Sequence, residues 1–164
     1  MILELQDYLH RHIPISSAMG VKVSEATTGR VVLSAPLNIN INHQSTVFGG
    51  SLHAVATLAC WSLLHLNLNK KFDSSKQIVI TESKINYLAP VTNDFFVECD
   101  MVDPNEWERF SLIFEKKGKG RIMLQSKIYM ESNLCVDYTG TFAAMTGKAV
   151  KGTLSTAKAN EINL

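Results

Sequence analysis

The most apolar stretch of the chain runs from Leu52 to Leu68 and carries hydrophobic side chains around nearly the whole circumference of a helix. A helix that is apolar all round has to be enclosed by other elements rather than docked on one face. Several polar residues interrupt the stretch, which indicates a buried helix and not a membrane span. We therefore expect a central helix that begins at Gly50 or Ser51 and ends near Asn67.

Strand patterns lie on both sides of this helix in the sequence. Val21–Ala26 and Arg30–Ala35 flank the turn Thr27–Gly29, which is the pattern of a hairpin. Downstream, β-branched and aromatic residues predict five further strands, namely Gln77–Leu88, Phe95–Val102, Arg109–Lys116, Arg121–Glu131 and Leu134–Met145.

Two of these segments show the clearest alternation of apolar and polar positions. One face is shared by Phe110, Leu112 and Phe114 in the first, and by Ile122, Leu124, Ile128 and Met130 in the second. Lys117–Gly120 predicts a short turn between them, and Ser132–Asn133 predicts the next turn. Short turns join antiparallel neighbours.

The pattern as a whole predicts an α+β chain of the hotdog type, in which an antiparallel sheet of five to seven strands wraps around one long helix. A short N-terminal helix, broken near Pro14, precedes the sheet, and residues 36–45 are expected to form a polar loop. We expect one domain over residues 1–147, followed by a polar, poorly ordered tail over residues 148–164.

Composition narrows the possible partners and location. The 164 residues carry sixteen basic and fifteen acidic side chains, so no overall field favours a nucleic acid or a membrane surface. Cys60, Cys99 and Cys135 lie in apolar sequence without CxxC spacing, as reduced thiols of a cytoplasmic protein do. The acidic N-terminus does not read as a secretory signal, and the histidines lack metal-ligand spacing.

Candidate chemistry concentrates where a polar loop meets the central helix. Gly49 and Gly50 stand at the helix start, so a ligand can approach backbone N–H groups at the positive end of the helix dipole. The Asn42 amide precedes them in the loop. These donors suit a thioester oxygen that becomes negative during reaction.

The residues around this loop resemble those of the "putative thioesterase" family of single-domain hotdog proteins, which also occurs fused behind an acetyltransferase domain. The resemblance rests on Ala35–Leu37, Asn40–Asn42, Thr46–Leu52, Trp61 and Tyr87–Pro90. It implies a homodimer, or a dimer of dimers, that processes acyl groups on acyl carrier protein or coenzyme A. The phosphopantetheine then belongs to the substrate, and no separate cofactor is expected. Family members include malonyl-acyl-carrier-protein decarboxylases of fatty-acid initiation.

The wider hotdog thioesterases differ from this chain at two positions of their common pattern. Phe48 stands in place of a histidine, and Thr57 stands in place of an acidic residue eight positions beyond Gly49. Hydrolysis needs a nucleophile or a base, which an unaided threonine hydroxyl does not supply. Decarboxylation of a malonyl thioester needs only stabilisation of the enolate oxygen, so we expect Asn42, Gly49, Gly50 and Thr57 to be catalytic.

The remaining assignments leave alternatives open. Phe48 and His53 are expected to bind substrate, although His53 can also act as a base for Thr57 or a water, which keeps thioester hydrolysis as the second hypothesis. A non-catalytic acyl-thioester binding module is the third. Thr57 can instead bond back to its own helix, and Asn42 can satisfy a turn. The Glu82 carboxylate can face either the pocket or, as we favour, the solvent.

An open antiparallel sheet also leaves an edge, and pairing of two edges around a two-fold axis is a common way to cover it. Sites in hotdog proteins lie where two subunits meet. We therefore expect the Asn42 loop and the helix start of one chain to face the region of Thr57 in its partner.

Overall fold

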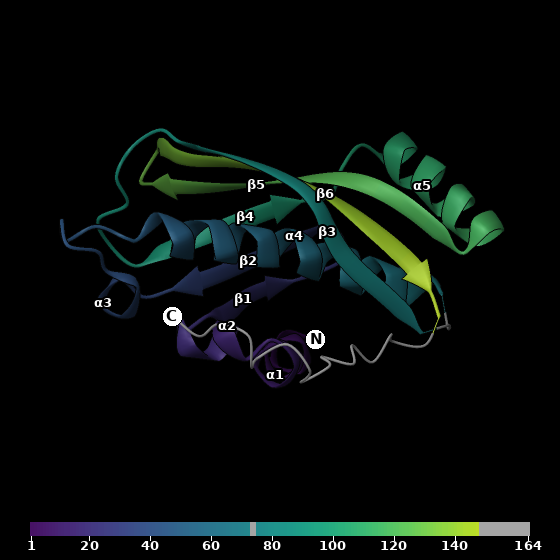
Figure 1. Cartoon of the computed structure of the whole chain (residues 1–164), viewed down its shortest axis with the longest axis horizontal. Coiled ribbons are helices and arrows are strands. Elements are labelled where there is room, and N and C mark those ends of the chain that lie inside the picture. Colours follow the sequence, from purple (N-terminus) through teal and green to yellow (C-terminus); the bar gives the residue numbers. More distant parts are fainter. Residues whose placement is uncertain (73–74, 148–164) are drawn as a thin grey trace, which may run out of the picture.

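A computed structural model describes residues 1–72 and 75–147 of the chain. Six antiparallel strands form one sheet in the order β1-β2-β4-β5-β6-β3, and the long helix α4 lies against its concave face (Figure 1). The expected tail, residues 148–164, falls outside the described residues. The strands are β1 (Lys22–Ala26), β2 (Arg30–Ala35), β3 (Lys76–Tyr87), β4 (Phe95–Asp100), β5 (Lys119–Met130) and β6 (Asn133–Thr146). This arrangement is the predicted hotdog fold.

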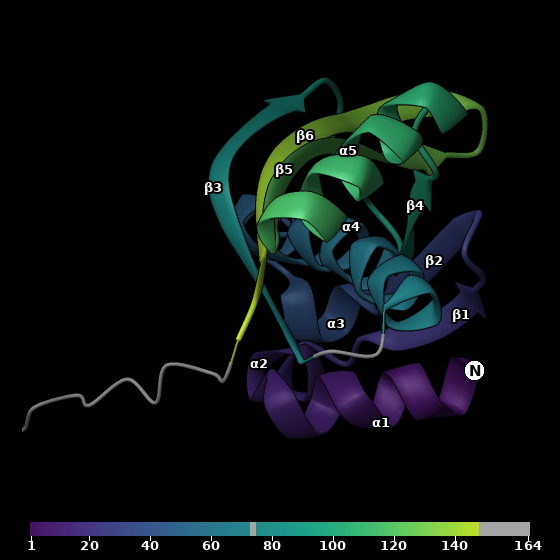
Figure 2. The same cartoon turned by 90° about the vertical axis from the view of Figure 1, so that its right-hand side faces the viewer.

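The central helix α4 (Gly49–Lys71) is longer than its sequence pattern suggested, by about one turn at its C-terminal end. Its side chains Val55, Ala59, Leu63 and others are fully buried and form the core with the inner face of the sheet. Enclosure is incomplete, however, because one stripe of the helix around Thr57 and Trp61 is only half-buried. Figure 2, which looks along the helix, shows the sheet curving around it. One face of α4 therefore borders open space.

Of the described helices, α4 is the one long and apolar enough to cross a membrane. Its most apolar window is 61% buried within the domain, as a core helix is.

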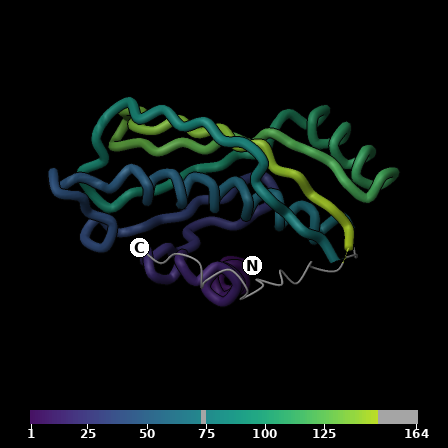
Figure 3. Tube along the Cα trace, viewed as in Figure 1, coloured from purple at the N-terminus to yellow at the C-terminus, as the bar shows by residue number. Residues whose placement is uncertain are grey.

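The N-terminal helix is confirmed as α1 (Ile2–His12), and Pro14 opens a second short helix, α2 (Pro14–Ala18). Leu5 and Leu9 of α1 enter the core. Tyr8 of α1 contacts His65 of α4 with ring centroids 4.6 Å apart, so α1 is fastened to the C-terminal half of the central helix. The Cα trace in Figure 3 shows α1 and α2 below the edge formed by β1. That edge of the sheet is consequently short and covered.

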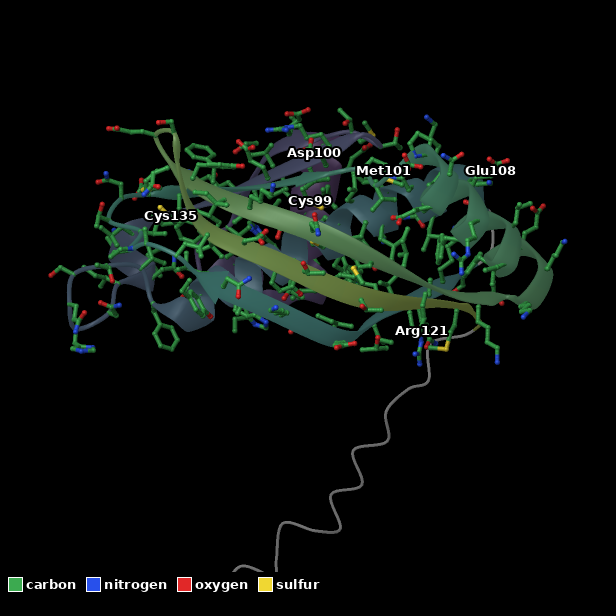
Figure 4. The ribbon with its side chains drawn as sticks, turned by 90° about the horizontal axis from the view of Figure 1, so that it is seen from above. Cys99, Asp100, Met101, Glu108, Arg121 and Cys135 are labelled. Atoms are coloured by element: carbon green, nitrogen blue, oxygen red, sulfur yellow. The ribbon has the colours of Figure 1, made fainter. Side chains whose placement is uncertain are left out.

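The predicted strand Arg109–Lys116 is wrong, because this segment belongs to a helix, α5 (Pro104–Lys117). Phe110 and Phe114 are buried one helical turn apart, whereas Leu112 is 48% exposed. Gly118, at φ +63°, ends the helix in the left-handed conformation, so the predicted turn Lys117–Gly120 is in fact a helix cap followed directly by β5. Figure 4 shows α5 at one end of the sheet, beyond Met101, with Arg121 of β5 nearby.

The loop before α4, the cysteines and the remaining strands also bear on the sequence predictions. The loop expected at residues 36–45 contains a single helical turn, α3 (Leu37–Asn40), and Asn40 of this turn donates to the carbonyls of Met19 and Pro36. Three free cysteines are buried, as expected of core thiols. The other four predicted downstream strands are present, and each end lies within two residues of the expected one.

Candidate functional site at the start and groove face of the central helix

The start of α4 presents two backbone donors without acceptors. Phe48 is the N-cap residue, and its carbonyl accepts from the N–H groups of Ser51 and Leu52. The N–H groups of Gly49 and Gly50 donate to no acceptor among the described residues. Because the first N–H groups of a helix lack partners within it and lie at the positive end of the helix dipole, this position can receive a negatively charged oxygen.

The two glycines at the helix start have different surroundings. A Cβ atom at Gly50 would lie 2.3 Å from the ring of Phe48, so the aromatic side chain packs directly on bare backbone. At Gly49 a Cβ would meet Tyr87 at an ordinary 3.4 Å, and the Tyr87 hydroxyl donates to the Gly49 carbonyl at 3.0 Å. Phe48 is 57% exposed. Its ring therefore forms an apolar wall beside the two free N–H groups.

The Asn42 side chain is engaged within its own loop. Its Oδ1 accepts from the N–H groups of Gln44 and Thr46, and its Nδ2 donates to Thr46 Oγ1 at 2.9 Å. The loop is closed by a bridge between Ile41 and Val47. Within a single chain, Asn42 thus serves the turn, with one amide hydrogen left for another acceptor.

Thr57 and His53 take part in a cluster of hydrogen-bonding side chains on the groove side of α4. Thr57 Oγ1 donates to the His53 carbonyl at 2.9 Å and also lies 2.8 Å from the Tyr138 hydroxyl. A hydroxyl has one proton, so the second contact is satisfied when Tyr138 donates to Thr57. His53 Nε2 lies 3.1 Å from Ser83 Oγ, and the His53 ring meets the edge of Tyr138.

Burial keeps the phenol of this cluster neutral. Tyr138 has no exposed surface, and desolvation raises the pKa of its phenol above the usual value of 10. The neighbouring hydroxyl groups of Thr57 and Ser83 oppose that rise only in part. The Tyr138 hydroxyl is therefore a hydrogen-bond donor at neutral pH.

The pairing of β3 with β6 decides which β3 side chains face the helix. Ser83 pairs with Gly140 on the inner face, whereas Glu82 pairs with Thr141 on the outer face, after a bulge between Ile80 and Glu82. Paired residues of neighbouring strands project to the same side of a sheet. The Glu82 carboxylate accordingly lies on the outer face, away from α4, as favoured from the sequence.

An open groove of about 830 Å³ runs between α4 and β3. Its lining is mainly apolar and includes no lysine or arginine; the half-buried Trp61, which donates to the Ile78 carbonyl, connects the two elements. Glu82 borders the groove, but its side chain projects to the other face. A second cavity, of about 490 Å³, lies on the outer side of β4 and β5 and is lined by several carboxylates, which would repel an anionic acyl carrier.

The expected site residues fall into two groups along the helix. Gly49, Gly50 and Phe48 stand at its start, and the His53 side chain is one turn further on. Thr57 lies eight residues beyond Gly49, or about 12 Å along the axis. Within a single chain, therefore, Thr57 and the free N–H groups cannot both contact one small ligand.

Sequence reasoning missed Ser83 and Tyr138. Both come from strands distant in sequence from α4, and their hydroxyls meet Thr57 and His53 only through the register of β3 and β6. The sequence does contain one signal, Gly140, because a glycine inside a strand pattern marks a close approach of other atoms. In the structure a Cβ at this position would lie 2.7 Å from the Tyr138 hydroxyl.

Known proteins resemble this chain in sequence and in fold. The family model described as "Putative thioesterase (yiiD_Cterm)" matches residues 2–146. A protein of unknown function from Chlorobaculum tepidum TLS is 33% identical, with a TM-score of 0.82 over 88% of this chain and 93% of that one. A protein described as a "putative thioesterase" from Shewanella oneidensis is 28% identical, with a TM-score of 0.77 over 88% of this chain and 96% of that one. The thioesterase HI1161 from Haemophilus influenzae, 16% identical with a TM-score of 0.63, covers 80% of this chain and 82% of its own and shares the fold.

Proposed function

Because the chain belongs to the "putative thioesterase" family of hotdog proteins, we propose that it is an enzyme acting on acyl thioesters of acyl carrier protein or coenzyme A. Within that class we propose decarboxylation of a malonyl thioester to an acetyl thioester. One observation carries this choice: among the described residues, the helix side of the groove presents hydroxyl groups and an imidazole around Thr57, and no carboxylate.

The absence of an acid on that face of the described groove separates the two reactions. A hydrolase needs a group that activates water or attacks the thioester, and carboxylates serve in that role. Thr57 holds its proton on the His53 carbonyl and accepts from a neutral phenol, so it is not set up as a base. A carboxylate here would also repel the malonyl carboxylate, whereas an uncharged hydroxyl group does not.

The reaction follows from the electron flow. The bond between the malonyl carboxylate and the α-carbon breaks, carbon dioxide leaves, and the electron pair moves into an enolate whose charge rests on the thioester oxygen. The Gly49 and Gly50 N–H groups are free to hold that oxygen. One such donor contributes roughly 3 kcal/mol to a transition state. Protonation of the α-carbon then yields the acetyl thioester.

Two copies of the chain are part of the proposal. The malonyl carboxylate lies about four bonds, each roughly 1.2–1.5 Å, from the thioester oxygen, which is far less than the separation of Gly49 and Thr57 along α4. We propose that Thr57 of a second copy approaches the helix start, together with the spare amide hydrogen of Asn42. Phe48 then walls the acyl group off from water.

The exposed edge of β3 supports this pairing. The strand has twelve residues, ends the sheet on one side, and carries Val79 and Ile80 at 45% and 41% exposure. A long edge strand with exposed apolar side chains invites a second strand. A homodimer formed through β3, or a dimer of such dimers, would close the groove. The phosphopantetheine of the carrier supplies the thiol, and we place the reaction in the cytoplasm.

Variants at Thr57 test the proposed reaction. Purified protein is incubated with malonyl-, acetyl- and octanoyl-coenzyme A and with the matching carrier-protein thioesters, while product masses and free thiol are followed. Thr57→Ser should retain malonyl turnover, and Thr57→Asp should lose it by about 100-fold or more, because the new carboxylate repels the substrate. Ser24→Ala, an exposed hydroxyl on β1, is the control.

Other outcomes would replace the proposal. Stoichiometric thiol without acetyl thioester would assign hydrolysis, with a water held by His53 and Ser83 as its nucleophile. Binding of all thioesters without turnover would assign a carrier-binding module. Equal malonyl turnover by Thr57→Asp and wild type would remove the role given to the neutral groove.

A further inference from the structure

The His53 imidazole and the Ser83 hydroxyl form a pair that the proposed reaction has not yet used. His53 Nε2 lies 3.1 Å from Ser83 Oγ, and His53 Nδ1 has no partner among the described residues. We propose that His53 is the acid that protonates the α-carbon of the enolate, and that Ser83 and Tyr138 are positioning residues that hold its ring. This inference rests on the proposed decarboxylation.

The position of His53 on α4 suits this role. It follows Gly49 and Gly50 by three to four residues, the spacing of neighbours on a helix surface. Helical side chains lean toward the N-terminus, so the His53 ring extends back toward the two free N–H groups. The α-carbon of an enolate is two bonds from the oxygen that those groups hold. His53 is thus the titratable side chain of α4 nearest to the carbon that needs a proton.

Ser83 determines which ring nitrogen exchanges the proton. In the imidazolium form both nitrogens carry hydrogen. The Nε2–H donates to Ser83 Oγ, and this bond persists after Nδ1 has released its proton. Tyr138, which contacts both Thr57 and the His53 ring, lies beside this pair. The contact of Nε2 with Ser83 therefore leaves Nδ1 as the exchanging atom.

Gly140 leaves space for the side chains around His53 and Ser83. Gly140 pairs with Ser83 across the β3–β6 ladder, and a Cβ at Gly140 would lie 2.7 Å from the Tyr138 hydroxyl. Tyr138 has no exposed surface, so its hydroxyl depends on the space left by this glycine to meet the other members of the cluster. The edge of Tyr138 also supports the His53 ring, with centroids 5.5 Å apart.

The proton balance of the step is complete. The carbon–carbon double bond of the enolate takes the Nδ1 proton of the imidazolium and forms a new C–H bond. The thioester carbonyl is restored, and His53 becomes neutral with hydrogen on Nε2. Water then returns a proton to Nδ1, because the His53 side chain is only half-buried.

Variants of His53 test the acid role on the full chain with malonyl-coenzyme A. His53→Ala and His53→Gln should each lower acetyl-thioester formation by roughly 100-fold, within the range for general acids. Added imidazole should restore part of the His53→Ala activity, and the pH profile of the rate should differ from that of the wild type in both variants. Circular dichroism checks that each variant is folded.

Variants of Ser83 test the positioning role. Ser83→Ala should lower the rate by about tenfold and Ser83→Thr should restore most of it, because a hydroxyl is retained. Ser24→Ala again serves as the control hydroxyl. Unchanged rates and pH profiles in the His53 variants, or no rescue by imidazole, would overturn the inference while the decarboxylase assignment stood. No acetyl thioester from the wild type would instead remove the function on which the inference rests.

Discussion

Gly140 leaves the space in which the Tyr138 hydroxyl reaches Thr57. A Cβ atom at position 140 would lie 2.7 Å from that hydroxyl, which is itself 2.8 Å from Thr57 Oγ1. A strand glycine, a buried phenol and a helix hydroxyl therefore form one unit. Its members come from separate elements, so their arrangement is a property of the folded sheet.

Gly140→Ala should disrupt this unit. The new methyl group has to displace the Tyr138 ring, which costs about 1–3 kcal/mol of unfolding free energy, as overpacking of a core does. Urea unfolding measures this change, and malonyl turnover should fall with it. Gly29→Ala is a matched control, because its Cβ would meet only Thr27 Oγ1, at 3.8 Å. Equal stability of Gly140→Ala and wild type would contradict the packing described for Tyr138.

The two glycines of the helix start should respond differently to alanine. Gly50→Ala moves the exposed Phe48 ring away from the N–H groups, so turnover should fall by roughly 10- to 100-fold. Stability should change by less than about 1 kcal/mol, because the ring can swing into solvent and alanine favours a helix. Gly49→Ala places its methyl group in ordinary contact with Tyr87 and should be milder. Steady-state kinetics measure the turnover of both variants. A greater loss in Gly49→Ala than in Gly50→Ala would argue against Phe48 as the wall of the site.

The helix α5 can be tested against the strand that its sequence resembles. Phe114→Ala should cost about 3–5 kcal/mol, because this ring is buried against Phe72 and Phe110. Leu112→Ala should cost no more than about 0.5 kcal/mol. Urea denaturation measures both. Comparable losses would indicate that the two side chains share a buried face, as they would in a strand.

This segment shows why part of the fold could not be predicted from the sequence. Phe110 and Phe114 fit both a period of two and a helical turn, and the short segment does not separate these periods. The decisive signals flank it: Asp103 caps the helix by accepting from the Asn105 N–H, Pro104 follows, and Gly118 ends it. By contrast, the apolar circumference of α4 has one physical solution, enclosure by a sheet, so the overall architecture was predictable.

The candidate site likewise has one part that the sequence predicts and one part that it does not. Gly49, Gly50 and Phe48 are adjacent in sequence, and a loop that runs into a helix fixes their relation. Ser83 and Tyr138 reach His53 and Thr57 through strand register, which a single sequence does not specify beyond its alternation. The bulge before Glu82 shifts that alternation. The polar half of the groove therefore emerged only from the fold.

Acid should loosen the attachment of α1 through His65. Burial, Lys76 and His12 lower the pKa of His65 from 6.5 to about 4, and Asn69 Nδ2 donates to its Nε2, which favours the neutral ring. The unfolded chain therefore binds more protons between about pH 6.5 and pH 4, and stability falls as pH falls through that window. The loss should reach about 2 kcal/mol, allowing for the side of the ring that meets solvent.

His65→Gln isolates this contribution. The variant should lose less stability than the wild type when urea unfolding is compared at about pH 7 and pH 4.5. His43→Gln, in the exposed loop before α4, should behave as the wild type does. A His65→Gln variant with the full wild-type acid sensitivity would show that another group is responsible.

The exposed edge of β3 should hold the proposed dimer. Val79→Lys places a charge on that edge and should convert the dimer to a monomer in sedimentation velocity, with loss of turnover because the site needs both chains. Met123→Lys, at a position that is also exposed, on the outer face of β5, is the control. A Val79→Lys variant that remained dimeric and active would place the interface elsewhere.

The fate of a malonyl thioester tests the central claim most directly, namely that a groove with neutral donors around Thr57 decarboxylates and does not hydrolyse. Purified protein is mixed with malonyl-acyl carrier protein, and intact mass spectrometry and a thiol reagent follow the products together. The account predicts acetyl-acyl carrier protein, with loss of carbon dioxide and no rise in free thiol. Free carrier thiol formed in step with substrate loss, without acetyl thioester, would contradict it.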